Sequence, residues 1–205
     1  MKVTLHHYTP LIVCASAIRT CWQSFDKSDA GGEKDRELID RVGNKFKHAS
    51  TLEHLNYNFY IEGISRALLQ ELARHRIASL SVKSTRYTLK ELKDEKPFTA
   101  EERERASKYL VMTGEDIVDE MSIKALENLR YVLGEGISND RAKYCLPESY
   151  KTELTWSVNA RSLQNFIFLR SDKAALWEIR ELAHMLFDAL PQDHKYLFEE
   201  SLKKY

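Results

Sequence analysis

The sequence predicts an α/β fold in which helices flank a small, largely antiparallel sheet, within a single domain spanning residues 1–205. Four segments have strand patterns, at residues 2–8, 55–62, about 79–90 and 152–158. Segments with helical periodicity separate these strands. A chain of 205 residues, of which 43% are hydrophobic, is long enough to bury ~70% of its unfolded surface around one core.

The overall charge is zero, because 31 basic residues balance 31 acidic ones. General electrostatic attraction to nucleic acid or to an anionic membrane is therefore not expected. No run approaches the roughly 18 apolar residues of a membrane span, and the N-terminal residues lack the apolar core of a signal peptide. We expect a cytoplasmic protein without nucleic-acid or membrane partners.

Three cysteines, Cys14, Cys21 and Cys145, are an odd number without a Cys-x-x-Cys pair. This pattern fits a reducing compartment better than a disulfide framework, and we expect free thiols that are mostly packed. Cys14 and Cys21 lie seven residues apart and share a helix face. Burial of small side chains explains this pair better than a metal site, which requires closer spacing and further ligands.

The first part of the chain is expected to form a strand followed by two helices. Strand 2–8 leads to Thr9 and Pro10, which predict an N-cap and a first helical position for a helix that ends near Trp22. Apolar residues at helical spacing predict a second helix over about 33–47.

The polar segment 48–54 is interpreted as a loop that enters the second strand. Over residues 55–62 apolar and polar residues alternate, which is typical of a half-buried strand, and Gly63 is expected to end it. A helix from about Ile64 is then expected to end near Arg74.

The second half of the chain is expected to be mainly helical. Thr99 and Glu102 form a capping box for a helix to about Thr113. The other expected elements are a helix over about 115–133, a short helix from Ser138 through Cys145, the strand 152–158, a helix over 159–170, and a last helix capped by Ser171 and Asp172 and ended by Pro191.

Residues 74–87 form the densest polar patch in the chain. Residues 64–90 contain six Lys or Arg and one acid, and the hydroxyls of Ser79, Ser81, Ser84 and Thr85 lie among the cations. Guanidinium groups with nearby hydroxyl donors bind phosphate and other oxyanions through charge-assisted hydrogen bonds. An extended segment 79–87 places Ser84 and Arg86 on one strand face, where they can contact one ligand. We interpret the patch as an anion site, although cations at the end of a helix also suit its dipole.

A second informative stretch is the helix expected over 159–170. Arg161 and Asn165 lie four residues apart, so they share a face and can contact one ligand. Arg170 lies nine residues beyond Arg161, about two and a half turns, and points the opposite way on a straight helix. We therefore expect either that the helix ends before Arg170 or that Arg170 serves a different site, one completed by a neighbouring subunit.

Two motifs resemble those of the flavin-dependent thymidylate synthases. The first is Arg74-His75-Arg76, a gap of seven residues and then Ser84-x-Arg86. The second is Asn159-x-Arg161-Ser162-Leu163-x-Asn165-Phe166, followed by Arg170. The fixed spacing makes the signal specific, and weaker likeness covers most of the chain.

The resemblance implies the family's fold and an enzyme, a methyltransferase that makes dTMP from dUMP. Such an enzyme takes a one-carbon unit from methylenetetrahydrofolate and a hydride from FAD, which NADPH reduces again. The resemblance also implies a homotetramer whose active sites draw on several subunits.

Roles for particular residues follow from the same resemblance. Arg170 would contact the uracil and favour its ionised form, a catalytic role for a cation placed where negative charge develops. The residues implied to bind dUMP, chiefly its phosphate, are Glu71, Arg74, Ser84, Thr85, Arg86 and Lys143, together with Arg170. The residues implied to line the FAD site are His48, Ser50, Glu53, Arg74, His75, Arg76, Asn159, Arg161 and Asn165.

Three positions depart from the family pattern. Glu71 stands where Gln is common, and Val82 stands where an acidic or amide residue is usual. Lys143 stands where Arg is common, and a lysine cannot reproduce a bidentate contact. These differences bear on ligand affinity more than on the class of reaction.

Other chemical roles are open to a few of these residues. Cys145, with Arg141 and Lys143 nearby, is a candidate nucleophile, but a packed thiol is favoured. Ser84 has no His-Asp partner and no Gly-x-Ser-x-Gly elbow, so we give it a binding role. The seven histidines lack metal-ligand spacing, so no metal is expected.

Two rival functions use the same basic patch. A non-catalytic nucleotide or RNA-binding module would stack bases on Tyr57, Tyr60 and Tyr87, although the neutral net charge counts against it. The other rival is a family scaffold whose altered positions have abolished turnover. Bound flavin separates the enzyme from the first rival, and dUMP-dependent oxidation of NADPH separates it from the second.

Overall fold

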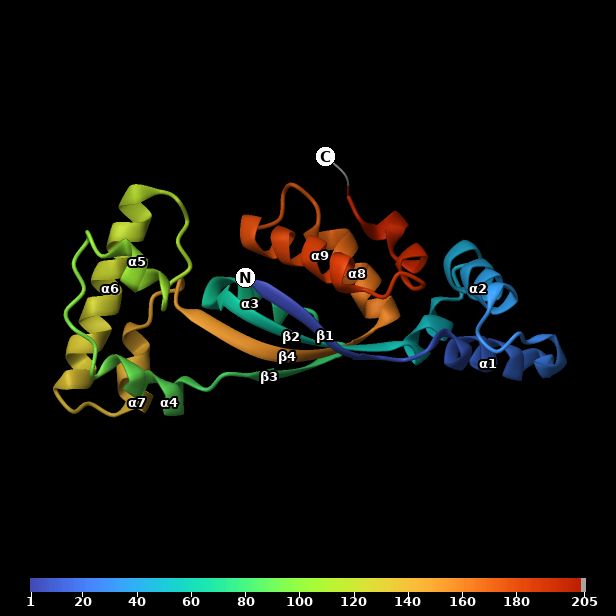
Figure 1. Cartoon of the computed structure of the whole chain (residues 1–205), viewed down its shortest axis with the longest axis horizontal. Coiled ribbons are helices and arrows are strands. Elements are labelled where there is room, and N and C mark those ends of the chain that lie inside the picture. Colours follow the sequence, from blue (N-terminus) through green and yellow to red (C-terminus); the bar gives the residue numbers. More distant parts are fainter. Residues whose placement is uncertain (204–205) are drawn as a thin grey trace. The chain divides into compact units, whose positions relative to one another are not determined.

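The computed structural model describes residues 1–203 and divides into two compact units (Figure 1). Unit 1 comprises Met1–Ile61, Leu72–Ser81 and Thr155–Tyr205. Unit 2 comprises Glu62–Glu71 and Val82–Leu154.

Four strands form one sheet in the order β1-β2-β4-β3. They are β1 (Lys2–Tyr8), β2 (Asn56–Ser65), β3 (Ala78–Val82) and β4 (Lys151–Asn159). Backbone hydrogen bonds from Thr9 to Asn56 and from Ala160 to Leu55 follow the antiparallel register of neighbouring strands. The predicted fold class, helices around a small antiparallel sheet, is confirmed.

Aromatic side chains from β2 and β4 make the core of unit 1. Alternate residues point inward, so Tyr57, Phe59 and Trp156 are fully buried, as the period-two pattern predicted. Trp156 meets Phe166 of α8 (Ala160–Arg170) edge to face, with ring centroids 5.2 Å apart. Figure 1 shows α8 and α9 (Trp177–Ala189) covering one face of these strands.

A buried ion pair holds the N-terminal helices of unit 1 together. Arg19 of α1 (Leu11–Trp22) donates from Nη2 and Nε to Oδ1 of Asp35, at 2.6 and 3.0 Å. Asp35 lies in α2 (Glu33–Ile39) and also accepts from the Ser28 hydroxyl at 2.6 Å. Burial alone raises the pKa of Asp35, but the hydrogen bonds from Ser28 and Arg19 outweigh it, so this pKa is lowered. The chain continues from α2 through π-helical turns over Asp40–Lys45.

Unit 2 has its own core around the long helix α6 (Asp116–Gly134), which confirms the helix predicted over about 115–133. The apolar stripe of α6 comprises Ile123, Leu126, Leu129 and Leu133. The shorter helices are α3 (Arg66–Leu72), which extends into unit 1, α4 (Thr85–Thr88), α5 (Arg103–Ser107) and α7 (Asn139–Ala142).

The strand predicted over about 79–90 is too long. β3 ends at Val82, and Ser84 then caps α4, because its carbonyl accepts from the amides of Tyr87 and Thr88. Ser84 and Arg86 therefore do not share a strand face. The Ser84 hydroxyl itself makes no capping hydrogen bond, so the turn is held by these backbone hydrogen bonds.

Gly63 does not end β2. The strand continues to Ser65, and Gly63 adopts a φ of 71°, which its missing side chain allows within the strand. The helix predicted over 99–113 is only α5, although half of the predicted capping box is present. Glu102 accepts from the Thr99 amide at 3.1 Å.

Two predicted helix starts are also wrong. The Thr9 hydroxyl accepts from the Asn56 amide at 3.1 Å, so it serves the sheet and α1 begins at Leu11. Asp172 accepts from the Ala174 amide at 2.9 Å, so it stabilises a turn and α9 begins only at Trp177. In both cases the side-chain oxygen that was predicted to cap the helix accepts a hydrogen bond from a backbone amide outside that helix instead.

All three thiols are free, but only Cys14 is buried, so the prediction of mostly packed thiols is wrong. Cys21 lies in the last turn of α1, beyond the last buried residue of that helix, and is exposed. Cys145 is also exposed, because it ends the turn Lys143–Cys145 instead of a packed helix face. Burial raises the pKa of the Cys14 thiol to about 12.

Within residues 1–203, no helix combines the length and apolar character needed to cross a membrane.

Candidate active site

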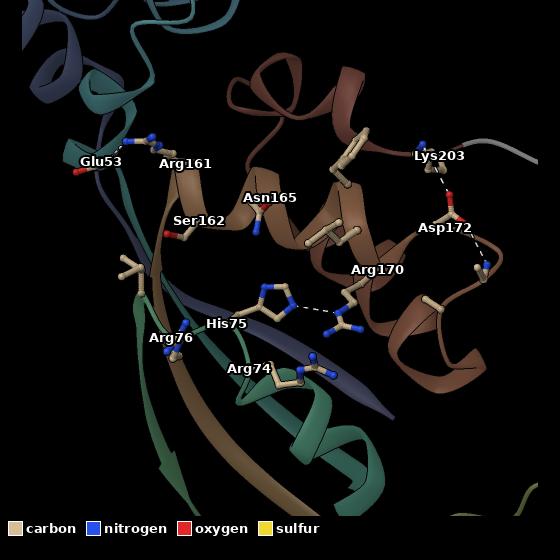
Figure 2. A pocket seen from close by; sticks show the side chains of 15 residues that line it. Glu53, Arg74, His75, Arg76, Arg161, Ser162, Asn165, Arg170, Asp172 and Lys203 are labelled. Carbon is tan, nitrogen blue, oxygen red and sulfur yellow. Dashed lines mark hydrogen bonds and ion pairs between the residues drawn. The ribbon is translucent and has the colours of Figure 1, made fainter.

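A cavity of about 1370 Å³ lies in unit 1, and both sequence motifs contribute to its wall (Figure 2). Most of its lining residues come from α8, from the segment after α3 and from the turn after α8, and Glu53 and Lys203 join them from other parts of unit 1. The lining residues are Glu53, Arg74, His75, Arg76, Ile77, Arg161, Ser162, Asn165, Phe168, Leu169, Arg170, Asp172, Ala174, Ala175 and Lys203.

The junction of β4 and α8 positions one side of the cavity. Asn159 ends β4 and caps α8 without an intervening loop, because its side-chain Oδ1 accepts from the Ser162 amide at 2.9 Å. The helix phase then carries Arg161 and Asn165 to the cavity on one face, as predicted.

Arg170 lines the same cavity as Arg161, and α8 continues through Arg170. The prediction that the helix ends before Arg170 is therefore wrong, and the alternative, that Arg170 serves a site completed by a neighbouring subunit, stays a prediction. Figure 2 shows the two arginines near opposite ends of α8, both beside the cavity. A cavity that runs along a helix can be reached from more than one face, because arginine side chains are long and flexible.

His75 joins the two motifs directly. Nε of Arg170 donates to Nε2 of His75 at 3.0 Å, although the residues lie 95 positions apart in the sequence. The His75 ring also meets the Phe166 ring edge to face, with centroids 4.8 Å apart. Its backbone amide donates to the carbonyl of Leu72, the last residue of α3. The helix end and α8 together fix this histidine.

The cavity wall is positive overall. Five cationic side chains line it against two carboxylates, a formal excess of +3. Arg161 pairs with Glu53 at 2.7 Å, and both side chains are about half exposed. Lys203 lies 3.7 Å from Asp172 and 4.4 Å above the Phe168 ring. The wall thus combines anion-binding groups with apolar surface from Ile77, Phe168 and Leu169.

The predicted dUMP residues other than Arg74 and Arg170 lie in unit 2. Ser84 and Thr85 begin α4, and Arg86 in that helix pairs with Asp140 of α7 through contacts of 2.7 and 3.3 Å. The Asn139 side chain donates to the Arg86 carbonyl at 2.8 Å, which ties α4 to α7. Lys143 follows in the turn after α7, and Glu71 lies near the end of α3.

Three predicted FAD residues do not line the cavity. His48 and Ser50 are exposed at the start of the 3-10 segment Ala49–His54, while Glu53 from the same segment reaches the wall. Asn159 lies at the base of α8, where its side chain is used for capping.

Sequence reasoning missed several members of the wall. Phe168 and Leu169 lie three and four residues after Asn165, so the helical period carried a signal for them. Lys203 carried no signal, because its position depends on the fold of the last segment. Its amide donates to the buried Ser171 hydroxyl at 3.0 Å.

In the part of the chain that the structure describes, no group of three or more His, Cys, Asp or Glu side chains is arranged to hold a metal ion.

Residues 4–194 match the model of the family described as Thy1, thymidylate synthase complementing protein. A flavin-dependent thymidylate synthase of Campylobacter jejuni is 70% identical over 204 residues, covering 100% of this chain and 99% of the relative. One of Wolinella succinogenes is 73% identical over 198 residues, covering 97% of each chain.

A solved structure is also similar over its whole length. The crystal structure of thymidylate synthase X from Helicobacter pylori with FAD and dUMP matches with a TM-score of 0.96 and 60% identity, and the match covers 100% of both chains.

Proposed function

The chain belongs to the family of flavin-dependent thymidylate synthases, and from this premise we propose that it catalyses the reductive methylation of dUMP to dTMP. The carbon donor is methylenetetrahydrofolate, and NADPH supplies the reducing equivalents through FAD. The reaction provides dTMP for deoxynucleotide synthesis.

The observation that carries the proposal is the convergence of two distant motifs on one positive cavity. Its volume of about 1370 Å³ exceeds the roughly 300–1,000 Å³ of sites for small ligands, so it is large enough for a dinucleotide such as FAD. The cationic wall suits a pyrophosphate, and Ile77, Phe168 and Leu169 offer apolar surface to a flat ring. The residues present therefore fit FAD.

When bound, FAD supplies the hydride. The chain's own residues bind and orient the ligands. His75, Arg76, Arg161 and Asn165 hold FAD from the two sides of the cavity, together with Glu53. We retain His48, Ser50 and Asn159 as FAD residues in this proposal because they lie close in the sequence to Glu53 and Arg161, which line the cavity.

The dUMP phosphate is held by guanidinium and hydroxyl groups in this proposal. Arg74, Ser84, Thr85 and Arg86 form the main contacts, with Lys143 and Glu71 beside them. Arg170 faces the uracil, where a fixed positive charge stabilises the ionised ring and favours its attack on the one-carbon unit.

Arg86 belongs to unit 2 and Arg170 to unit 1, and the proposal includes a homotetramer in which one site draws on several subunits. Co-expression of R86A and R170A chains tests this arrangement. If a site takes these arginines from different subunits, random mixing restores about one quarter of the wild-type sites. Mixed chains that stay as inactive as either variant alone would reject the shared site. Sedimentation analysis gives the number of subunits.

The proposal also includes a single domain over residues 1–205 and a location in the cytoplasm. A single urea transition, followed both by the fluorescence of the three tryptophans, all in unit 1, and by the circular dichroism of the whole chain, supports one domain. Separate transitions for the two signals contradict it.

The deciding experiment is the visible spectrum of purified, FAD-supplemented protein under anaerobic conditions. NADPH is added with and without dUMP, and bleaching of bound flavin that depends on dUMP supports the oxidoreductase half-reaction. Formation of dTMP on addition of methylenetetrahydrofolate completes the test. Protein that holds FAD but does not oxidise NADPH when dUMP is present is an inactive scaffold.

A further inference from the structure

We propose that His75 is a positioning residue for Arg170, fixing the direction of the guanidinium that faces the uracil. This inference rests on the proposed function, because it concerns how Arg170 acts in that reaction. The resemblance placed His75 only among the residues of the FAD site. The hydrogen bond between the two side chains assigns it a second role (Figure 2).

The chemistry of this hydrogen bond defines the state of the imidazole. An arginine donates and never accepts, so Nε2 of His75 must offer a lone pair at 3.0 Å. The ring is then neutral and carries its proton on Nδ1. Protonation of Nε2 would remove the acceptor and place two positive groups against each other.

The His75 ring is held by rigid surroundings. Phe166 is fully buried and meets both His75, at 4.8 Å, and Trp156, at 5.2 Å. The turn that bonds the His75 amide to Leu72 fixes its backbone. Because the core holds the His75 acceptor in place, the hydrogen bond fixes the direction of the Arg170 guanidinium. The arginine side chain has several rotatable bonds and does not fix this direction by itself.

The contact involves one donor of the guanidinium. His75 takes the Nε hydrogen, and an arginine has four further N–H donors on its two terminal nitrogens. A neutral ring orients the guanidinium without adding negative charge beside it. Glu53 differs in this respect, because it places a carboxylate 2.7 Å from Arg161.

Two substitutions separate positioning from FAD binding. H75F keeps a ring against Phe166 and removes the acceptor, whereas H75Q keeps an acceptor oxygen near the place of Nε2. At saturating FAD and dUMP, H75F lowers kcat by about 10- to 100-fold, the range for losing a hydrogen bond to a charged group. H75Q, which keeps an acceptor, is expected to lose less of kcat than H75F. Equal kcat in H75F and wild type at saturating FAD would overturn the inference, and so would equal losses in both variants.

A double-mutant cycle tests whether His75 acts through Arg170. R170K keeps the positive charge but has no Nε–H group. In the R170K background, H75F lowers kcat by less than about 3-fold, because the contact is already lost. If H75F costs the same factor in both backgrounds, the two residues act independently and the inference is wrong.

The tautomer of His75 gives a test that needs no active variant. In ¹⁵N-histidine spectra of the FAD-loaded wild-type protein, the His75 signal is expected to show a protonated Nδ1 and an unprotonated Nε2. The signal missing from H75Q spectra identifies it. A protonated Nε2 would overturn the inference. If the wild-type protein shows no thymidylate synthase turnover, the proposed function is refuted. The tautomer of His75 still shows in that case whether Nε2 accepts the hydrogen bond from Arg170.

Discussion

Removal of the Asp140 charge is expected to tighten the binding of dUMP. Arg86, proposed to hold the dUMP phosphate, is bound to the Asp140 carboxylate by contacts of 2.7 and 3.3 Å. A phosphate that approaches Arg86 therefore meets a guanidinium that is already paired, and a negative charge next to it. The D140N substitution keeps a side chain of the same shape and an acceptor oxygen but removes that charge.

The exposure of the pair sets the size of the effect. The side chains of Arg86 and Asp140 are 59% and 55% exposed, so solvent screens the interaction strongly. Ion pairs of this kind contribute ~0.2–1 kcal/mol, which corresponds to a factor of about 1.4 to 5 in a dissociation constant. We expect D140N to lower the Kd of dUMP within this range, and the gain to shrink at high ionic strength.

Isothermal titration of FAD-loaded protein with dUMP at two salt concentrations measures the change. D116N is the matched control, because Asp116 pairs with Arg103 at 2.6 Å on the surface of the same unit and is not in the proposed site. The control is expected to bind dUMP like wild type. Weaker binding in D140N alone would refute the reasoning, because it would mean that Asp140 positions Arg86 for the phosphate.

Three further predictions concern a buried ion pair of unit 1 and the cysteines. R19M leaves the Asp35 carboxylate buried without its cation, so urea denaturation is expected to show a loss of about 3–5 kcal/mol, and a loss below 1 kcal/mol would contradict the importance of the pair. The lowered pKa of Asp35 means that its stabilisation is present above the unfolded-state pKa and is lost as the pH falls through the folded-state pKa. Thermal unfolding followed against pH should therefore show an acid loss that is reduced in D35N. A disulfide reagent at pH 8 should modify the exposed Cys21 and Cys145 in native protein and spare Cys14, whose pKa is raised to about 12. Modification of all three thiols without unfolding would contradict this.

Regular periodicity made the main elements predictable. The alternation around Tyr57 and Phe59 and the stripe of α6 reflect burial of one face, which the sequence records directly. The motif residues Arg161 and Asn165 were placed correctly on one helix face, because helix geometry alone decides it.

Local competition for hydrogen bonds explains what was wrong. The Thr9 hydroxyl can accept a hydrogen bond from a helix amide or from a neighbouring strand, and the Ser84 carbonyl can likewise accept from a helical turn or from a strand. Only the folded chain decides between these partners. Arg161 and Arg170 line one cavity because of where the other elements of its wall lie, and the helical periodicity of the sequence carries no information about those elements. The exposure of Cys145 likewise follows from tertiary packing.

The direct passage from β4 into α8 restricts how this protein can vary in length. Asn159 ends one element and begins the next, so no residue between them can absorb an insertion. One added residue there would turn the helix by about 100° and carry Arg161 off the cavity wall. One added residue within β4 would move Trp156 to the opposite face of the sheet. Insertions and deletions among natural variants are therefore expected in exposed turns such as residues 134–136 and to be absent from residues 156–165.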